Sequence, residues 1–302
     1  MLDKVRNWLR ENLMEQGPAF DAAALEWYDT AAAEIAAGVS DTRFGSLISM
    51  ASRKARPRPA ELSEAALERA AEILEGWNPF DWTVLEMARV GLILARTDLQ
   101  EASSSAAFKS ALEYADMGEL CALYRSMAFM PRAQDYVWQA AEGCRSNMSD
   151  VFRAIACDNP FPAAHFDDVA WRSLAIKALF SGAPLWRVHG LDGRLGEQLA
   201  IVALDLADER RSASRPVQPE LWLCLGTNGG ERALESMKLE LLGANPGGRS
   251  AAAYGLARAG RSDLLRELRE KEKDPGVLNA MDRALAGQHS QIEFRTLHCQ
   301  PH

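Results

Sequence analysis

The sequence predicts an all-α protein, an α/α superhelix of HEAT-like helical hairpins that is irregular in the middle. Alternation of apolar and polar residues with a period of two, which is the pattern of a half-buried strand, is almost absent. Alanine, leucine, glutamate and arginine dominate instead, and these residues favour helices. Helical segments of about 10–18 residues alternate with short connectors that carry Gly, Pro, Asn or Asp, as in stacked helix pairs.

The chain has 302 residues, enough for a sizeable core, and its net charge of -8 argues against general binding to nucleic acids or anionic membranes. No apolar stretch approaches the roughly 20 residues of a membrane span, and charges interrupt the N-terminus too often for a secretory signal. The five cysteines are widely spaced and form no C-x-x-C pair, which argues against a zinc ribbon or a disulfide framework. We therefore expect a cytoplasmic protein with no nucleic-acid partner and no membrane span.

The N-terminal segments have clear helical patterns. The first is an amphipathic helix that should pack on the core through one apolar stripe, formed by Leu2, Val5, Leu9 and Leu13. In "ELSEAALERAAEILEGW", Ser63 is expected to cap a helix that ends at Gly76. The next segment, "NPFDWTVLEMARVGLILA", is apolar on almost every side, so its helix should be buried.

The segment "GCRSNMSDVFRAIACDNPFP" (143–162) allows two interpretations. Arg145 and Asn147 follow a helix end, and they could hold a carboxylate or phosphate at the N-terminus of the next helix. Alternatively, Arg145 binds helix-terminal carbonyls or a carboxylate and has a structural role. Asn159 precedes Pro160 and therefore indicates a turn.

The segment "HFDDVAWRSLAIKALF" (165–180) predicts a helix whose N-terminus Asp167 caps. One buried face is expected to comprise Trp171, Leu174, Ala175, Ala178 and Leu179. Lys177 lies off this face and is most simply solvated. The alternative is that the acids belong to the edge of a metal or acid/base site.

The loop that follows contributes His189, Asp192 and Arg194. His165 and His189 lie near opposite ends of the predicted helix, which at 1.5 Å per residue separates them by roughly 20 Å. Without an HExxH motif or a compact carboxylate triad, we expect no metal site. Asp192 is predicted to cap a helix over residues 193–213.

The clearest repeat lies near the C-terminus, in "RSAAAYGLARAGRSDLLRELREKEKDPGVLNAMDRAL". Small residues on its first helix would let a second helix approach closely, and the Asp274–Pro275 pair would start a third. We predict a single helical-repeat domain over residues 1–288, followed by a flexible tail at 289–302.

Several sequence motifs of enzymes are missing. The chain has no GxxxxGK[ST] loop, no strand-borne GxGxxG, no GxSxG elbow and no DDxxD pair. We therefore expect no cofactor.

The middle of the chain resembles the EboA family, bacterial metabolite-traffic proteins of a gene cluster that makes or moves a secondary metabolite. The segments that match are an RSN turn, an NPFP turn, the 166–180 helix, the GLD loop and a PELW motif, and the resembling core spans about 44–271. The matching positions are Arg145, Ser146 and Asn147; Asn159, Pro160, Phe161 and Pro162; Phe166, Asp167, Ala170 and Trp171; Lys177, Ala178, Leu179 and Phe180; Gly182 and Pro184; Gly190, Leu191, Asp192 and Arg194; and Glu209, Arg210, Arg215, Val217, Pro219, Glu220, Leu221 and Trp222.

The resemblance implies a non-catalytic helical scaffold or carrier that binds a small-molecule metabolite or an enzyme of the same gene cluster. A superhelix suits this role because each added helix pair extends one continuous surface. The expected ligand-binding residues are Arg145, Asn147, Asp167, Trp171, Lys177, Asp192 and Arg194, with the cations holding anionic groups. Two alternatives stay open: an enzyme of the same pathway that uses Asp167 or Asp192 as acid or base, and a structural subunit that forms a homo-oligomer.

Overall fold

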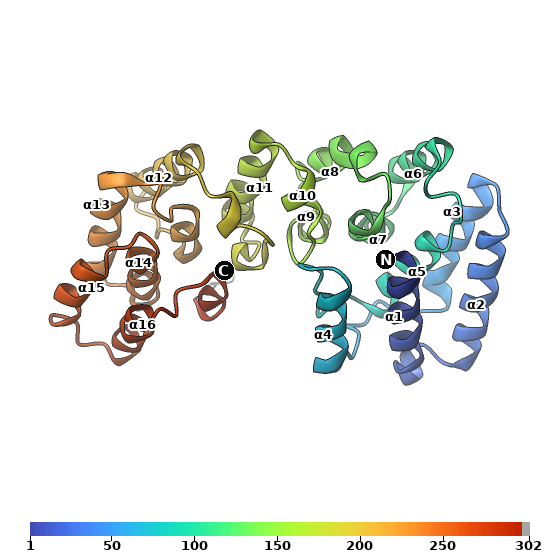
Figure 1. Ribbon diagram of the computed structural model, residues 1–302, viewed down its shortest axis with the longest axis horizontal. Helices are drawn as coiled ribbons and strands as arrows, with labels where there is room; N and C mark the ends of the chain where they lie inside the picture. Colours follow the sequence, from blue (N-terminus) through green and yellow to red (C-terminus); the bar gives the residue numbers. More distant parts are fainter. Residues whose placement is uncertain (298–302) are drawn as a thin grey trace. The chain divides into compact units, whose positions relative to one another are not determined.

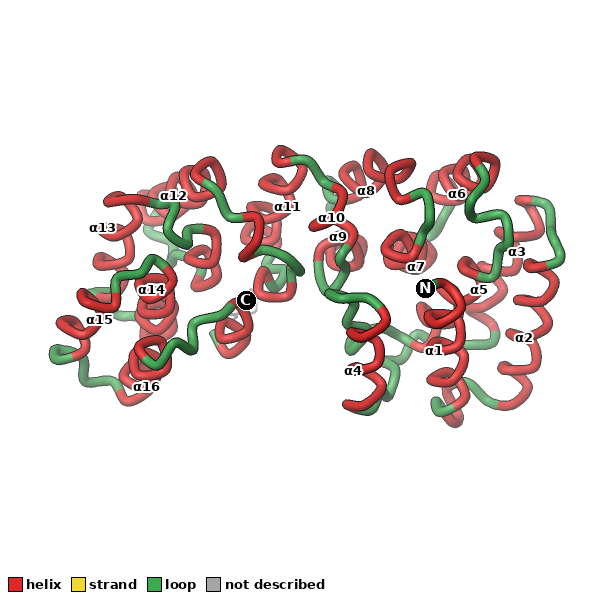
Figure 2. The backbone as a smooth tube through the Cα atoms, viewed as in Figure 1, coloured by secondary structure: helices red, strands yellow, loops and turns green. Residues whose placement is uncertain are grey.

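A computed structural model of the protein describes residues 1–297. Within this range the chain is all-α: helices joined by loops make up the fold, and no strand occurs apart from an isolated bridge between Pro59 and Thr83 (Figures 1 and 2). The all-α prediction is therefore confirmed, while the HEAT-like pairing stays a prediction. The chain divides into two compact units, which we call unit 1 (Met1–Asp167) and unit 2 (from Asp168 onwards).

Unit 1 contains ten α-helices and four 3-10 helices among the described residues. The α-helices are α1 (Leu2–Met14), α2 (Ala22–Ala36), α3 (Asp41–Met50), α4 (Glu64–Ile73), α5 (Val84–Leu94), α6 (Ala102–Tyr114), α7 (Met117–Ser126), α8 (Val137–Gly143), α9 (Ser149–Ala156) and α10 (Phe161–His165). The 3-10 helices are η1 (Gly17–Ala19), η2 (Ala51–Arg53), η3 (Met127–Phe129) and η4 (Ala133–Tyr136).

Helix α5 is the centre of unit 1. Every one of its residues is buried, as its apolar sequence predicts, and it packs against α1, α2, α3 and α7. Its N-terminus is fixed by a capping box, in which Thr83 accepts from the Glu86 amide and Glu86 accepts from the Thr83 amide. Three of the four residues of the predicted α1 stripe, Val5, Leu9 and Leu13, are buried, whereas Leu2 is half-buried at the start of the helix. Helix α1 packs on α5, and Ser63 caps α4 as expected.

Unit 2 contains six α-helices and four 3-10 helices among the described residues. These are α11 (Asp168–Ser181), η5 (Leu185–Arg187), η6 (Asp192–Arg194), α12 (Glu197–Ser212), η7 (Pro219–Cys224), α13 (Gly230–Leu241), α14 (Pro246–Arg258), α15 (Ser262–Arg269), α16 (Pro275–Leu285) and η8 (Gln291–Thr296).

Helix α14 is the centre of unit 2 and packs against α13, α15, α16 and η7. Close packing depends on its small residues, because a Cβ added at Gly255 would lie 2.7 Å from Met237 Sδ and 3.1 Å from Trp222 Cβ. The buried face predicted for the 165–180 helix is confirmed in α11, where all five apolar residues are buried. Asp274 caps α16 through the amides of Gly276 and Val277.

One predicted helix start is wrong. Asp192 does not cap a helix that begins at 193, because Asp192–Arg194 forms the short helix η6 and α12 begins only at Glu197, after Gly196. Glycines at 193 and 196 favour helix poorly, and the Asp192 carboxylate is bound by Arg258 of α14 instead.

The predicted domain boundaries stay a prediction. In the segment 289–297, Phe294 of η8 is fully buried, and the Gln291 side chain donates to the carbonyls of Trp186 and Val188. Residues 298–302, the end of the predicted tail, lie outside the described range. Within residues 1–297, no helix combines the length and the apolar character that a membrane crossing requires.

Candidate functional site

The seven residues predicted to bind a ligand are divided between the two units. Arg145, Asn147 and Asp167 lie in unit 1, and Trp171, Lys177, Asp192 and Arg194 lie in unit 2. Arg145 and Asn147 are exposed in the turn between α8 and α9, where Arg145 forms an ion pair with Glu142 of α8. Asp167 is exposed directly before α11, and Lys177 is half-buried on that helix.

The structure brings Trp171 and Arg194 together. The Arg194 guanidinium lies 4.7 Å from the centroid of the buried Trp171 ring, and its Nη2 donates a 3.1 Å hydrogen bond to Asp168 Oδ1. Both residues line a cavity of about 370 Å³ at the start of α12. A cation therefore does lie on the face of Trp171, although the Arg194 guanidinium already donates a hydrogen bond to Asp168.

A second cavity of unit 2, of about 510 Å³, lies beside Asp192. Asp192 accepts hydrogen bonds from both Nη atoms of Arg258, so this carboxylate is bound by a residue 66 positions away. We call this hollow the Arg258 cavity. Its wall residues are Asp192, Leu195, Gly226, Thr227, Asn228, Arg258, Gly287, His289 and Ser290.

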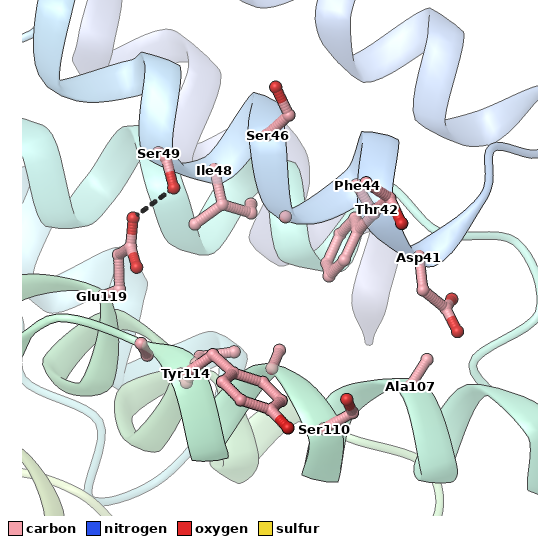
Figure 3. A pocket seen from close by; sticks show the side chains of 14 residues that line it. Asp41, Thr42, Phe44, Ser46, Ile48, Ser49, Ala107, Ser110, Tyr114 and Glu119 are labelled. Atoms are coloured by element: carbon pink, nitrogen blue, oxygen red, sulfur yellow. Dashed lines mark hydrogen bonds between the residues drawn. The ribbon is translucent and has the colours of Figure 1, made fainter.

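The most apolar of these hollows is in unit 1, between α3 and α6, and has a volume of about 380 Å³ (Figure 3). We call it the α3–α6 groove. Figure 3 shows Phe44 and Ile48 of α3 on one side and Ala107, Ser110 and Tyr114 of α6 on the other. Its complete lining is Asp41, Thr42, Phe44, Gly45, Ser46, Ile48, Ser49, Ala107, Ser110, Ala111, Tyr114, Ala115, Glu119 and Leu123.

One end of the groove is fixed by a network of polar side chains around Glu119. Ser49 Oγ donates a 2.6 Å hydrogen bond to Glu119 Oε1 (Figure 3), and the Asp116 amide donates to Glu119 Oε2. Arg89 of α5 lies 3.5 Å from the same carboxylate, and its Nε donates to the Ile48 carbonyl. These bonds tie α3, α5 and α7 together, and they satisfy the Glu119 carboxylate with groups of the protein itself.

Arg96 holds the other end of the groove. Its guanidinium lies 5.0 Å from the centroid of the Phe44 ring, binds Asp98 through two hydrogen bonds and lies 3.6 Å from Asp41 Oδ1. The Arg96 hydrogen bonds lower the pKa of Asp98 despite the opposing effect of burial. Phe44 is thus held in position by a cation stacked on its ring.

The histidine, cysteine and carboxylate side chains of the described residues are the candidates for metal binding and for nucleophilic attack. No group of three or more His, Cys, Asp or Glu side chains within residues 1–297 has the geometry to hold a metal ion. Burial raises the pKa of the Cys121 and Cys224 thiols to about 12, so these thiols are protonated at neutral pH. Burial also lowers the pKa of His165.

The lining of the α3–α6 groove was not predicted from the sequence. The available signal is a set of small and hydroxyl residues at helical spacing, Gly45 and Ser49 on α3 and Ala107, Ser110 and Ala111 on α6. Such stripes usually indicate close helix packing rather than a cavity, so the pattern alone does not predict the groove. Arg258 was missed because its partner is distant in the sequence.

The described geometry can be compared with known proteins. The family described as "Metabolite traffic protein EboA" matches residues 1–226. This range includes the α3–α6 groove and Asp192 but ends before Arg258, and it differs from the resembling core expected at 44–271. No curated protein and no solved structure matches the chain.

Proposed function

The chain belongs to the EboA family of metabolite traffic proteins, and on this premise we propose that it is a non-catalytic carrier or scaffold that holds a small metabolite in the α3–α6 groove. The observation that carries the proposal is the composition of this groove, an apolar surface with a hydroxyl-rich rim. Binding pockets for small organic molecules are usually apolar hollows with a few polar groups that fix orientation.

The lining indicates the chemistry of the ligand. Phe44, Ile48 and Leu123 offer apolar surface, and the rim offers side-chain hydroxyls together with the carboxylates of Asp41 and Glu119. No lysine, arginine or histidine is among the fourteen lining residues. We therefore expect a largely apolar, neutral or cationic molecule with hydrogen-bond donors, and not the anionic ligand that the sequence suggested.

The hydrogen bonds of Glu119, a carboxylate that lines the groove, support binding without catalysis. Glu119 accepts from Ser49 and from the Asp116 amide and faces Arg89. A general base must be free to reach a substrate proton, and this carboxylate is occupied by structural partners. The buried free thiols of both units support a cytoplasmic location. A pathway enzyme as an additional partner also belongs to the proposal.

Filling the groove tests the proposal. Ser110 lines the groove and is exposed, so Ser110→Phe should occupy the cavity without disturbing the core. Ala106→Phe is the matched control, because Ala106 is an exposed residue of α6 outside the lining. With the neutral apolar dye Nile red as probe, fluorescence titration should give about tenfold weaker binding for Ser110→Phe and unchanged binding for the control.

The same two variants should also differ in their effect on metabolite output in cells. In a host that carries the gene cluster, Ser110→Phe should lower metabolite output while Ala106→Phe leaves it unchanged. Equal dye affinity in both variants and the parent protein, at unchanged thermal stability, would contradict binding in this groove.

A further inference from the structure

The Arg258 cavity of unit 2 is formed where three chain segments meet the end of α14. Asp192 and Leu195 come from η6 and the residues after it, Thr227 and Asn228 come from the turn before α13, and His289 and Ser290 follow α16. Gly226 in the second segment has a φ of +50°, and an added Cβ would lie 2.8 Å from Leu195 Cδ1. The wall at this point therefore requires glycine.

Arg258 is the buried anchor of the cavity. Its side chain is only 7% exposed, yet it lines the hollow and directs its Nη atoms to Asp192 and to the His289 carbonyl. Asp192 is 49% exposed, so the ion pair presents its carboxylate to solvent. Because the two charges compensate each other, the pair offers a carboxylate acceptor to a ligand without a net charge.

The remaining wall is rich in neutral hydrogen-bonding groups. Thr227, Asn228 and Ser290 are exposed and carry side chains that both donate and accept, and His289 is half-buried beside them. Leu195 is the one large apolar side chain among the nine wall residues. The wall of the Arg258 cavity is therefore less apolar than the lining of the α3–α6 groove.

From this arrangement we propose that the Arg258 cavity binds a neutral polyhydroxylated molecule, a sugar or a cyclic polyol. Each ligand hydroxyl both donates and accepts, and the wall combines the half-exposed Asp192 carboxylate, an acceptor, with the exposed side chains of Thr227, Asn228 and Ser290, which donate and accept. The volume of about 510 Å³ admits a ligand of this size. An inorganic anion fits less well, since the Asp192 carboxylate lies in the wall and neutralises Arg258.

This proposal is independent of the proposed function. The family match ends at residue 226, so most of the wall belongs to a part of the chain that the match does not include. The walls of the two hollows share no residue.

Saturation-transfer NMR with myo-inositol and with glucose as probes tests the site in the full chain. The double variant Asn228→Ala/Ser290→Ala removes two exposed wall groups without touching the core. The matched control is Ser212→Ala/Asn279→Ala, which changes exposed residues of the same types outside the cavity. We expect one or both polyols to bind the parent protein and the control, and to bind the wall variant at least about tenfold more weakly.

Several other outcomes of this experiment would overturn the proposal. Absence of saturation transfer from both polyols, or equal affinity in the wall variant and the control, would overturn the proposal. Competition of inorganic phosphate for the site with an affinity above that of the polyols would show an anion site instead and would also overturn it. Ser110→Phe should leave polyol binding unchanged, so failure of the groove proposal would be distinguishable from failure of this one.

Discussion

The Ser49 hydroxyl donates a 2.6 Å hydrogen bond to Glu119 Oε1, and this bond joins α3 to α7 across 70 residues of sequence. The acceptor carboxylate also faces Arg89, whose side chain is 3% exposed. A guanidinium buried to this extent needs compensation by nearby acceptors. The Ser49–Glu119–Arg89 network at this end of the α3–α6 groove therefore also stabilises unit 1.

Removal of the Glu119 charge should destabilise the protein. In Glu119→Gln the buried Arg89 keeps the Ile48 carbonyl and the more distant Asp116, at 3.8 Å, but loses the Glu119 carboxylate. We expect a loss of about 2–3 kcal/mol in the free energy of unfolding, measured by urea denaturation. Ser49→Ala removes only one hydrogen bond and should cost about 1 kcal/mol. A loss below the Ser49→Ala value in Glu119→Gln would show that Arg89 does not depend on this carboxylate.

The helices of the chain could largely be predicted from local patterns. The apolar stripe of α1, the all-round apolar sequence of α5 and the buried face of α11 each depend on residues within one helix, and the structure has them as expected. Periodicity indicates burial because apolar side chains on one face must leave water together. The caps Ser63 and Asp274 also depend on local sequence, because each side chain accepts from amides two or three residues further along the chain.

The candidate sites depend on contacts between distant segments, and the sequence does not specify these. Asp192 was expected to cap the next helix, but Arg258, 66 residues later, binds it. The α3–α6 groove is lined by residues of α3, α6 and α7, so its existence depends on how three helices pack and not on the pattern of any one of them. Of the seven predicted ligand-binding residues, Trp171 and Arg194 lie together, and a binding role for all seven stays a prediction.

Substitution of alanine for two helical glycines, Gly255 and Gly45, should change the stability of the protein in opposite directions. Gly255→Ala places a methyl group 2.7 Å from Met237 Sδ, and the fully buried Met237 and Trp222 leave little room to adjust. We expect about 1–2 kcal/mol of destabilisation, since overpacking outweighs the gain in helix propensity. At Gly45 an added Cβ meets no atom within 4 Å, so Gly45→Ala should stabilise by about 0.5–1 kcal/mol. Thermal unfolding of both variants measures the contrast, and a stabilising Gly255→Ala would show that α14 and its neighbours are less tightly packed than described.

The Arg96–Asp98 pair should make the stability of unit 1 depend on pH in the acidic range. Arg96 donates hydrogen bonds of 2.9 and 2.6 Å to the two oxygens of Asp98, and these bonds lower the pKa of that carboxyl in the folded protein. A group with a lowered folded pKa contributes stability above its unfolded pKa, near 3.9 for aspartate. This contribution is lost as the pH falls through the folded pKa, because the protonated carboxyl no longer pairs with Arg96. Asp98→Asn should therefore lower the free energy of unfolding by about 1–2 kcal/mol at pH 7, and the difference from the parent protein should shrink as the pH falls below the unfolded pKa near 3.9 and through the lowered folded pKa. Urea denaturation at a series of pH values from 7 to about 2.5 measures both effects. The control is Glu68→Gln, which should change neither, because Glu68 is exposed in the middle of α4 and away from the helix ends. A difference that stays constant over the whole pH series would show that Asp98 contributes through packing rather than through its charge.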